Sequence, residues 1–330
     1  MRIAVLGAGA WGTALALNLC HRHQVALWVW DQVQLEEMRV RRENTRFLPG
    51  FSIPDHLHVV GDANAALDSS DLALVVVPTA ALRETFQRIA ASRFPIPVIW
   101  ASKGFEAESA KLPHQIAEEE LSADVPRGVL SGPSFAQEVA KGLPTAITLA
   151  ASDESFAADT ARQLHSARLR VYSSDDLVGA EVGGAVKNVI AIAAGVSDGL
   201  EFGYNARAAL ITRGLAEITR LGMQLGGRIE TFSGLAGAGD LILTCTGDLS
   251  RNRRVGLLLA ENLVLEEILQ KLGHVAEGVY TARAIQTLAQ QHGVDMPITE
   301  AVCRLLFDGT APAVVVEELL SREPKAEHTA

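Results

Sequence analysis

The sequence has few of the residues that mark secreted, membrane-spanning or metal-dependent proteins. Its three cysteines lie far apart and none belongs to a CxxC pair, so no disulfide framework is expected and a reducing compartment is favoured. The nine histidines lack the spacing of metal ligands, so no metal site is expected. No uninterrupted apolar run approaches the ~18–20 residues that a membrane-spanning helix needs. Together these absences indicate a soluble, cytoplasmic protein without a membrane partner.

Positive charge is also in the minority. Lys and Arg number 29 against 39 Asp and Glu, a formal net charge of −10, which disfavours nucleic acid or an anionic membrane as a partner. An anionic ligand would therefore need a local concentration of basic residues. The opening MRIAVLGAGAWGTALAL resembles a signal peptide only briefly, because three glycines interrupt the apolar run and no cleavage-like boundary follows.

At 330 residues the chain exceeds what one hydrophobic core usually serves, so two domains are expected. Short apolar runs alternate with helix-period segments in the first half, a pattern typical of parallel strands joined by crossover helices. Alanine- and leucine-rich segments at helical spacing follow after about Asp176. We therefore predict an α/β fold, in which a doubly wound sheet domain (1–177) precedes an all-helical domain (178–330). Strands are expected at 2–6, 25–30, 72–77 and 98–102, with weaker ones at 57–60, 128–130, 146–150 and 169–172, and helices at 13–20, 32–42, 80–91 and 110–121.

The segment GAGAWG fits the GxGxxG pattern of dinucleotide-binding loops. It follows the predicted strand RIAVL and opens a helix, so Gly7 can form the tight turn, Gly9 lets the backbone approach a pyrophosphate, and Gly12 allows close helix–strand packing. The helix N-terminus, with Ala10 and Trp11, would offer N–H groups and partial positive charge to the phosphates. The alternative is an ordinary glycine turn.

Asp31 lies about 20 residues after this loop, where an acid can accept hydrogen bonds from the adenosine ribose. Such an acid favours NAD, since it would repel the extra phosphate of NADP. Alternatively Asp31 caps the next helix, and both interpretations predict a carboxylate here. No arginine adjoins it in the sequence; the nearest candidates are Arg41 and Arg42. Trp30 cannot neutralise a 2′-phosphate, although it can stack on adenine.

Ligands of open α/β sheets bind beyond the carboxyl ends of the strands, so residues that follow predicted strands are candidates. Pro78 follows LALVVV, Lys103 follows VIWAS, and the segment SGPS at 131–134 follows GVL. Lys103 would either donate to a carbonyl or phosphate oxygen, or extend its ammonium into solvent.

Lys187 lies in VGGAVKNVIAIAAG, a helical segment otherwise too apolar to face water. A helical side chain leans back over the preceding turn, which places Lys187 above Gly183 and Gly184. Two glycines inside a helix cost about 0.5–1 kcal/mol each relative to alanine, so the space they leave should have a use. That use is either a small substrate held against the ammonium or close packing on a neighbouring segment.

The segment GLAGAGDLILTCTGDLSRNRRVG supplies further polar groups. Asp240 follows a flexible glycine pair and Thr244 lies four residues on. Ser250 can cap a helix that starts at Arg251, which would join guanidinium and backbone N–H groups at one anion-binding end. We predict that this basic cluster, with Arg253 and Arg254, receives a phosphate; the alternative is a solvated helix start. GLAGAG itself lacks a preceding strand, so it is not a second nucleotide site.

At these residues the chain closely resembles the bacterial NAD(P)-dependent glycerol-3-phosphate dehydrogenases. The resemblance covers nearly the whole chain through GAGAWGTALA, ASKGFE, SGPSFAQEVAKGLPTA, GGAVKNVIAIAAG, NARAALITRGLAE, GAGDLILTCT and SRNRRVG, in that order. It implies a Rossmann-type dinucleotide-binding domain (1–177) followed by a helical substrate and catalytic domain (178–330). It also implies reversible hydride transfer between sn-glycerol 3-phosphate and a nicotinamide, run mainly toward glycerol 3-phosphate for phospholipid synthesis, by a homodimer. Many members have Arg or His where this chain has Trp30. This difference puts a preference for NADP in question.

The resemblance also assigns roles by position. Lys187 matches the proton acceptor of the family and would also contact the substrate. The implied substrate contacts are Lys103, Gly132, Ser134, Asp240, Ser250, Arg251 and Asn252, to which the residue pattern adds Thr244. The implied cofactor contacts are Trp11, Lys103, Ala136, Arg251, Val275 and Glu277, beside Gly7, Gly9, Ala10, Gly12, Trp30, Asp31 and Pro78.

Two other functions remain open on the sequence. A 3-hydroxyacid dehydrogenase with a catalytic lysine would bind a carboxylate instead of a phosphate. A nicotinamide-nucleotide sensor would bind the cofactor without turnover, but it would not need Lys187, Asp240 and a basic cluster together.

Overall fold

The structure is a computed structural model, and it describes residues 1–68, 70–92, 95–273 and 276–321. The described chain forms two compact units, which interleave along the sequence. Unit 1 comprises residues 1–184 and 222–240, and unit 2 comprises residues 185–221 together with the chain after Asp240. Because the units interleave, they do not test the predicted functional division into residues 1–177 and 178–330.

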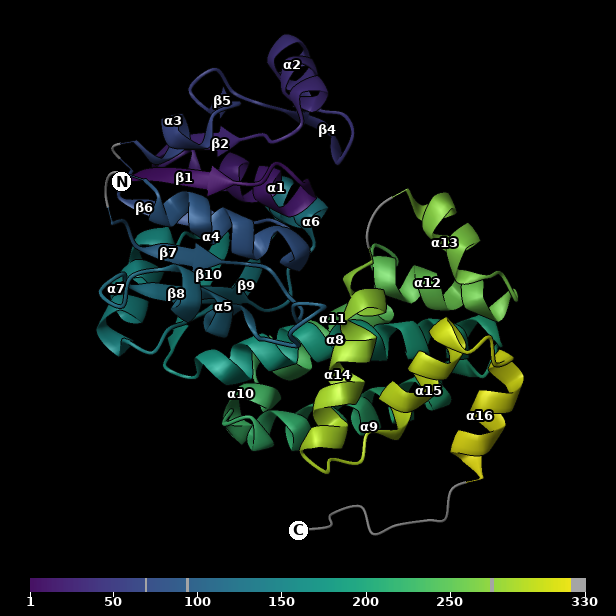
Figure 1. Ribbon diagram of the computed structural model, residues 1–330. Helices are drawn as coiled ribbons and strands as arrows, with labels where there is room; N and C mark the ends of the chain where they lie inside the picture. The colour runs from purple at the N-terminus through teal and green to yellow at the C-terminus, as the bar shows by residue number, and fades with distance from the viewer. Residues whose placement is uncertain (69, 93–94, 274–275, 322–330) are drawn as a thin grey trace. The chain divides into compact units, whose positions relative to one another are not determined.

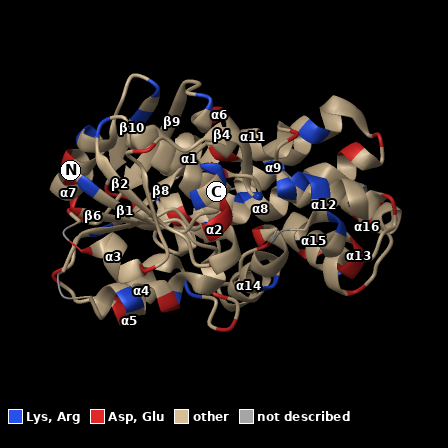
Figure 2. Ribbon diagram, turned by 90° about the horizontal axis from the view of Figure 1, so that it is seen from above, with Lys and Arg blue, Asp and Glu red and all other residues tan. Residues whose placement is uncertain are grey.

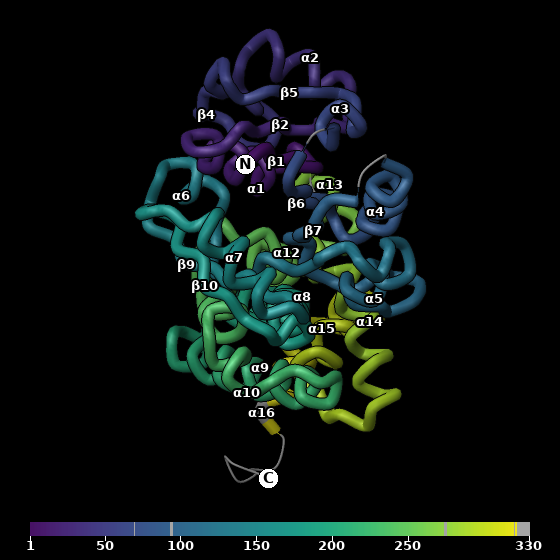
Figure 3. The backbone as a smooth tube through the Cα atoms, turned by 90° about the vertical axis from the view of Figure 1, so that its left-hand side faces the viewer, coloured from purple at the N-terminus to yellow at the C-terminus, as the bar shows by residue number. Residues whose placement is uncertain are grey.

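Unit 1 is built on an eight-stranded sheet in the order β10-β9-β8-β7-β6-β1-β2-β5, and the succession from β5 through β2, β1 and β6 to β7 can be followed in Figures 1 and 3. Every pairing is parallel except β8 with β9. The first six strands are β1 (Arg2–Leu6), β2 (Gln24–Trp28), β5 (His58–Val60), β6 (Leu72–Val75), β7 (Val98–Trp100) and β8 (Arg127–Ser131). The last two are β9 (Thr145–Ala150) and β10 (Leu169–Ser174).

Helices cover both faces of this sheet, as predicted for a doubly wound fold. One apolar layer joins the strands to α1 (Ala10–Leu19), α2 (Gln32–Arg41), α6 (Ala136–Ala140) and α7 (Glu154–Leu164). The other joins them to α3 (Ala63–Leu67), α4 (Leu82–Ala90), α5 (Pro113–Glu120) and the first turns of α8 (Leu177–Gly199). Alternate residues of β1 divide between the layers: Ile3 and Val5 enter the first, Ala4 and Leu6 the second. Burial on both faces explains the unbroken apolar runs of the strands.

The sequence analysis misplaced several boundaries and missed short elements. Helix α1 begins three residues before the predicted start, with Gly9 as its N-cap. The short hairpin of β3 (Glu43–Asn44) and β4 (Leu48–Ser52) was not predicted, because its polar residues and Pro49 do not read as a strand pair. Helices α3, α6 and α7 and the 3-10 turn η1 (Thr79–Ala81) were also missed. In unit 1 the chain is completed by α10 (Ile229–Ser233) and the π-helical turn η2 (Leu235–Gly239), which contains GLAGAG without any preceding strand.

Unit 2 is helical throughout its described residues. It contains most of α8 and α9 (Gly203–Gln224), all but the first residue of α11 (Asp240–Thr246), α12 (Arg251–Ala260) and α13 (Leu265–Leu272). It continues with α14 (Glu277–Gln291), α15 (Pro297–Phe307) and α16 (Pro312–Leu320). Glycines allow close helix contacts here: a Cβ at Gly195 would lie 2.0 Å from the carbonyl oxygen of Arg253 on α12. Glu217 of α9 accepts hydrogen bonds from the backbone N–H of Ile298 (2.7 Å) and of Thr299 (3.2 Å) and so caps α15.

Among the described residues, the 23-residue helix α8 is long and apolar enough to cross a membrane by length and composition, with a mean hydropathy of 1.5. Its apolar run is interrupted by Glu181 and Lys187. In its most apolar 18-residue window, 94% of the residues are buried inside the protein, as in the core helix of a globular domain.

Candidate active site

The glycine loop after β1 has the geometry that its sequence pattern predicts. Gly7 has a φ of +118°, and a Cβ there would lie 2.5 Å from the carbonyl oxygen of Val76. A Cβ at Gly12 would lie 1.9 Å from the carbonyl oxygen of Gly7, so both positions exclude side chains. A Cβ at Gly9, in contrast, would meet no atom within 4 Å. The turn and packing roles of Gly7 and Gly12 thus have a structural cause, whereas Gly9 borders open space where a ligand can approach the backbone.

Two buried amides hold this loop from outside, a feature that the sequence analysis missed. The carbonyl oxygen of Ala8 accepts from Gln34 Nε2 (2.7 Å) and from Asn44 Nδ2 (2.9 Å). Asn44 Nδ2 also donates to Thr13 Oγ1 at 2.8 Å, and Asn44 is only 1% exposed. The hairpin of β3 and β4 is therefore fixed to the glycine loop and to the first turn of α1.

Asp31 caps α2, as one of its two interpretations predicts. Its Oδ1 accepts from the backbone N–H of Gln34 at 2.9 Å, and that hydrogen bond lowers the pKa of the carboxyl. Its Oδ2 lies 3.4 Å from Arg46 Nη1, so the expectation that Arg41 and Arg42 are the nearest guanidinium groups is wrong. Arg42 instead donates to backbone carbonyls, including that of Leu57 at 3.1 Å. Trp30, just before Asp31, is exposed.

Lys103 points into the protein and not into solvent. It follows β7, while Gly132 follows the adjacent parallel strand β8, so both lie at the same edge of the sheet. Lys103 Nζ donates to the carbonyl oxygen of Gly132 (3.1 Å) and to Oδ2 of Asp240 (2.7 Å). Ser134 Oγ donates to the same carbonyl at 3.0 Å. Four of the predicted substrate contacts thus form one hydrogen-bonded group within unit 1, which we call the Lys103 cluster: Lys103, Gly132, Ser134 and Asp240.

Two backbone features shape the surroundings of the Lys103 cluster. Gly132 has a φ of +126°, a conformation that favours glycine. A Cβ at Gly184 would lie 3.4 Å from Lys103 Cγ and 2.9 Å from Ser131 Oγ, and one at Gly183 would lie 2.5 Å from the carbonyl oxygen of Ala236. The two glycines of α8 therefore serve close packing, which corrects the hypothesis that their space holds a substrate.

The remaining cofactor candidates of unit 1 lie at the starts of helical segments. Pro78 precedes η1 after strand β6 and is exposed. Ala136 begins α6, which packs against α1. Ala10 and Trp11 form the first turn of α1, and Trp11 packs partly against the core.

In unit 2, Lys187 lies on α8 and is 6% exposed. The next residue, Asn188, begins a short polar chain: its Oδ1 accepts from Asn252 Nδ2 at 2.9 Å. Oδ1 of Asn252 in turn accepts from the backbone N–H of Gly278 at 3.1 Å. Asn252, a predicted phosphate contact, is thereby fixed in orientation by α8 and α14.

The basic start of α12 is visible as blue ribbon in Figure 2. Ser250 caps this helix as predicted, because its Oγ accepts from the backbone N–H of Arg253 at 3.2 Å. Arg251 and Arg254 are exposed. Arg253 is not available to a phosphate, since its Nε lies 2.8 Å from Asp198 and its Nη1 lies 3.0 Å from Asp248. The predicted three-arginine receptor is thus reduced to the helix start and its exposed guanidinium groups.

Three further candidates complete the set. Thr244 is buried one turn after Asp240 on α11. Glu277 is half-buried and begins α14. Val275 lies outside the described residues.

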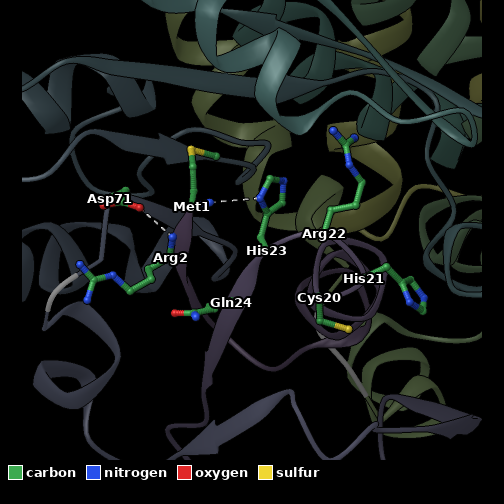
Figure 4. A pocket seen from close by; sticks show the side chains of 8 residues that line it. All are labelled: Met1, Arg2, Cys20, His21, Arg22, His23, Gln24 and Asp71. Atoms are coloured by element: carbon green, nitrogen blue, oxygen red, sulfur yellow. Dashed lines mark hydrogen bonds between the residues drawn. The ribbon is translucent and has the colours of Figure 1, made fainter.

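A shallow cavity of about 530 Å³ lies elsewhere on unit 1 (Figure 4). Met1, Arg2, His23 and Gln24 line it, so it opens at the amino ends of β1 and β2. Ligands of parallel α/β sheets bind at the opposite, carboxyl edge, where the glycine loop and the Lys103 cluster lie. We therefore do not assign the active site to this cavity.

Metal and disulfide chemistry find no support in the described residues. No group of three or more His, Cys, Asp or Glu side chains there could hold a metal ion. The three cysteines, Cys20, Cys245 and Cys303, are buried free thiols.

Comparison with known proteins agrees with the resemblance across both halves of the chain. Residues 2–157 match the family model of the NAD-dependent glycerol-3-phosphate dehydrogenase N-terminus, and residues 176–317 match that of the C-terminus. The glycerol-3-phosphate dehydrogenase [NAD(P)+] of Nitrosospira multiformis is 60% identical over 331 residues, covering 99% of both chains. The enzyme of that name from Nitrosomonas eutropha is 58% identical over 327 residues, again covering 99% of both.

A solved structure extends the comparison to three dimensions. The crystal structure of glycerol-3-phosphate dehydrogenase from Coxiella burnetii superimposes with a TM-score of 0.93 at 45% identity, covering 97% of this chain and 98% of that one. Two family models that match most of the chain, full-length relatives and a shared fold give one conclusion. This chain belongs to the NAD-dependent glycerol-3-phosphate dehydrogenase family.

Proposed function

We propose that this protein interconverts dihydroxyacetone phosphate and sn-glycerol 3-phosphate by hydride transfer with NAD(P)H. Full-length identity of 60% to a glycerol-3-phosphate dehydrogenase [NAD(P)+] is the observation that carries this proposal. The same match disfavours a 3-hydroxyacid dehydrogenase and a non-catalytic sensor. In the direction of reduction, the enzyme supplies glycerol 3-phosphate for phospholipid synthesis in the cytoplasm.

The glycine loop fits a nicotinamide dinucleotide. Gly9 borders open space, and α1 begins at Ala10 with N–H groups directed out of its first turn. The bound cofactor would supply the hydride. Gly7, Gly9, Ala10, Trp11 and Gly12 would hold its pyrophosphate, with Trp30, Asp31, Pro78, Lys103 and Ala136 from unit 1 and Arg251, Val275 and Glu277 from unit 2 as its other contacts.

The Lys103 cluster would bind the substrate in unit 1. Asp240 and the carbonyl oxygen of Gly132 orient the ammonium of Lys103 at the carboxyl edge of the sheet. We expect this ammonium to donate to a substrate oxygen and Ser134 to complete the contact. Asp240 is almost wholly buried, and its carboxylate offsets the charge of Lys103 and holds the ammonium in place.

In unit 2, Lys187 would give a proton to the carbonyl oxygen at C2 during reduction and take it back during oxidation. Lysine is one of the side chains that can serve as a general acid and base when it is held against the reacting group. Ser250, Arg251 and Asn252 would bind the phosphate at the start of α12, where a guanidinium and backbone N–H groups combine. Thr244, one turn from Asp240, would be a further substrate contact.

The proposal extends to partners. We expect a homodimer with no nucleic-acid or membrane partner, in keeping with the formal charge of −10.

Absorbance of the reduced nicotinamide tests the proposed activity. Purified protein with dihydroxyacetone phosphate should consume NADH, NADPH or both. In the reverse direction, sn-glycerol 3-phosphate and NAD(P)+ should give dihydroxyacetone phosphate and NAD(P)H. Consumption with a 3-keto acid but not with the phosphorylated triose would favour the hydroxyacid enzyme. Cofactor binding without any consumption would favour the sensor.

A further inference from the structure

Asp31 and Arg46 form an ion pair beside the glycine loop. One carboxylate oxygen of Asp31 is occupied as the cap of α2, and the other lies 3.4 Å from Arg46 Nη1. Among the described residues, Arg46 is the basic side chain paired with this carboxylate. The side chain of Asp31 is 34% exposed and that of Arg46 is 53% exposed. An exposed pair of this kind adds little to stability, so both charges remain accessible to a ligand.

The position of Arg46 is fixed by the loop that it adjoins. Arg46 lies in the turn between β3 and β4, whose Phe47 backbone N–H donates to Asn44 Oδ1 at 3.2 Å. Asn44 is the residue that donates to the carbonyl oxygen of Ala8 in the glycine loop. The guanidinium lies over the ring of Phe47, 5.0 Å from its centroid. A single buried asparagine therefore ties the turn that carries Arg46 to the proposed pyrophosphate site.

We propose that Arg46 receives the 2′-phosphate of NADP, and that the Asp31–Arg46 pair sets the preference between NAD and NADP. This inference rests on the proposed function of the glycine loop as a dinucleotide site. An acid after the second strand accepts hydrogen bonds from ribose hydroxyls and repels a 2′-phosphate. Arg46 offsets that repulsion, because a guanidinium can exchange a carboxylate for a phosphate with the same fork geometry. Trp30 offers no charge for this purpose.

Two small ligands separate this role from the rest of the cofactor. Adenosine 2′,5′-bisphosphate carries the 2′-phosphate, whereas AMP carries a ribose hydroxyl there. In isothermal titration calorimetry with the full-length protein, Arg46→Ala should weaken the binding of adenosine 2′,5′-bisphosphate about 10- to 100-fold, as expected for the loss of one charge-assisted contact. The dissociation constant of AMP should change by less than about 3-fold. The corresponding change should appear in the dissociation constants of NADPH and NADH.

Arg39→Ala is the matched control. Arg39 lies on α2, pairs with Glu36 and is similarly exposed, so its loss changes net charge by the same amount without touching the pair. Arg39→Ala should leave the dissociation constants of both ligands within about 2-fold of wild type, because exposed charges contribute weakly at a distance. Asp31→Asn should strengthen the binding of the bisphosphate and weaken the binding of AMP. The assignment would be overturned if Arg46→Ala lost affinity equally for both ligands, or if Arg39→Ala lost as much affinity for the bisphosphate as Arg46→Ala.

These measurements do not depend on turnover. If the wild type reduces dihydroxyacetone phosphate while Arg46→Ala keeps full affinity for the bisphosphate, the Arg46 assignment fails and the proposed function stands. If Arg46→Ala behaves as expected while the wild type turns over no phosphorylated triose, the proposed function fails and the assignment stands. Wild-type protein that binds neither the two nucleotides nor NAD(P)H would refute both.

Discussion

Lys103 Nζ lies 2.7 Å from the carboxylate of Asp240, and the Asp240 side chain is only 2% exposed. The two residues are 137 positions apart in the sequence, and they give the carboxyl edge of the sheet a fixed ammonium group. A buried charge that loses its partner is strongly destabilising.

We therefore expect Lys103→Met to lower the free energy of unfolding by about 3 kcal/mol, because it removes the ammonium that lies 2.7 Å from the buried carboxylate of Asp240. It should also abolish most activity. The double variant Lys103→Met/Asp240→Asn should recover stability, measured by urea denaturation, but not activity. A Lys103→Met protein with wild-type stability and rate would contradict both the pair and its proposed role.

Lys187 should be indispensable for turnover. Lys187→Ala and Lys187→Arg should both lose at least about 100-fold in kcat, the scale of general acid–base catalysis. Arginine keeps the charge but does not release a proton, so its failure would separate proton transfer from simple attraction. Dissociation constants for NAD(P)H should stay near wild type. A Lys187→Arg enzyme that keeps most of its rate would assign the proton to another group.

Arg251 and Arg254 offer a matched comparison for phosphate binding, since both are exposed arginines on α12. Arg251→Ala should lower kcat/KM for dihydroxyacetone phosphate about 10- to 100-fold, as expected for loss of a charge-assisted hydrogen bond. Arg254→Ala should change it by less than about 3-fold, because Arg254 is not among the proposed phosphate contacts Ser250, Arg251 and Asn252, and an exposed charge without direct contact is screened by salt. Equal effects would indicate general electrostatic attraction instead of a specific clamp.

Glu217 gives a prediction about stability alone. Burial raises the pKa of this carboxyl to about 7, against the partly opposing hydrogen bonds from Ile298 and Thr299. The folded-state pKa lies above the unfolded value, so the stability due to this group is fully present below about pH 4.5 and is lost as pH rises to about 7. The loss can reach about 3 kcal/mol.

Glu217→Gln should remove this pH dependence. The difference in unfolding free energy between wild type and variant should shrink, or reverse, as pH rises from about 5 to 8. Urea denaturation across that range measures it, and Arg254→Ala serves as a control with unchanged pH dependence. A constant difference at every pH would show that Glu217 does not titrate in this window.

Features coded by local spacing were predictable from the sequence. The glycine loop was found because Gly7, Gly9 and Gly12 stand at fixed offsets after a strand, and strand β1 was predicted with its observed bounds. Lys103 was found because it follows a buried strand in an α/β pattern. The capping roles of Asp31 and Ser250 depend on the next three residues alone.

Features that depend on distant segments were missed. Asn44 reaches the glycine loop only because a short hairpin reverses the chain, and its polar sequence carries no strand signal. Arg46 meets Asp31 for the same reason. Arg253 looked available in the sequence, but Asp198, 55 residues away, holds it. Local patterns do not encode such contacts, because the partner is set by packing.

The dinucleotide-binding half of this protein is not a detachable module. A truncated chain that ended at residue 184 would retain every strand of the large sheet but would lack residues 222–240 of its own compact unit. Gly183 would lose its backbone neighbour at Ala236, and Lys103 would lose its counter-ion. The first 184 residues therefore depend on residues 222–240 to complete their fold, and a single cut after residue 184 would leave the core of unit 1 incomplete.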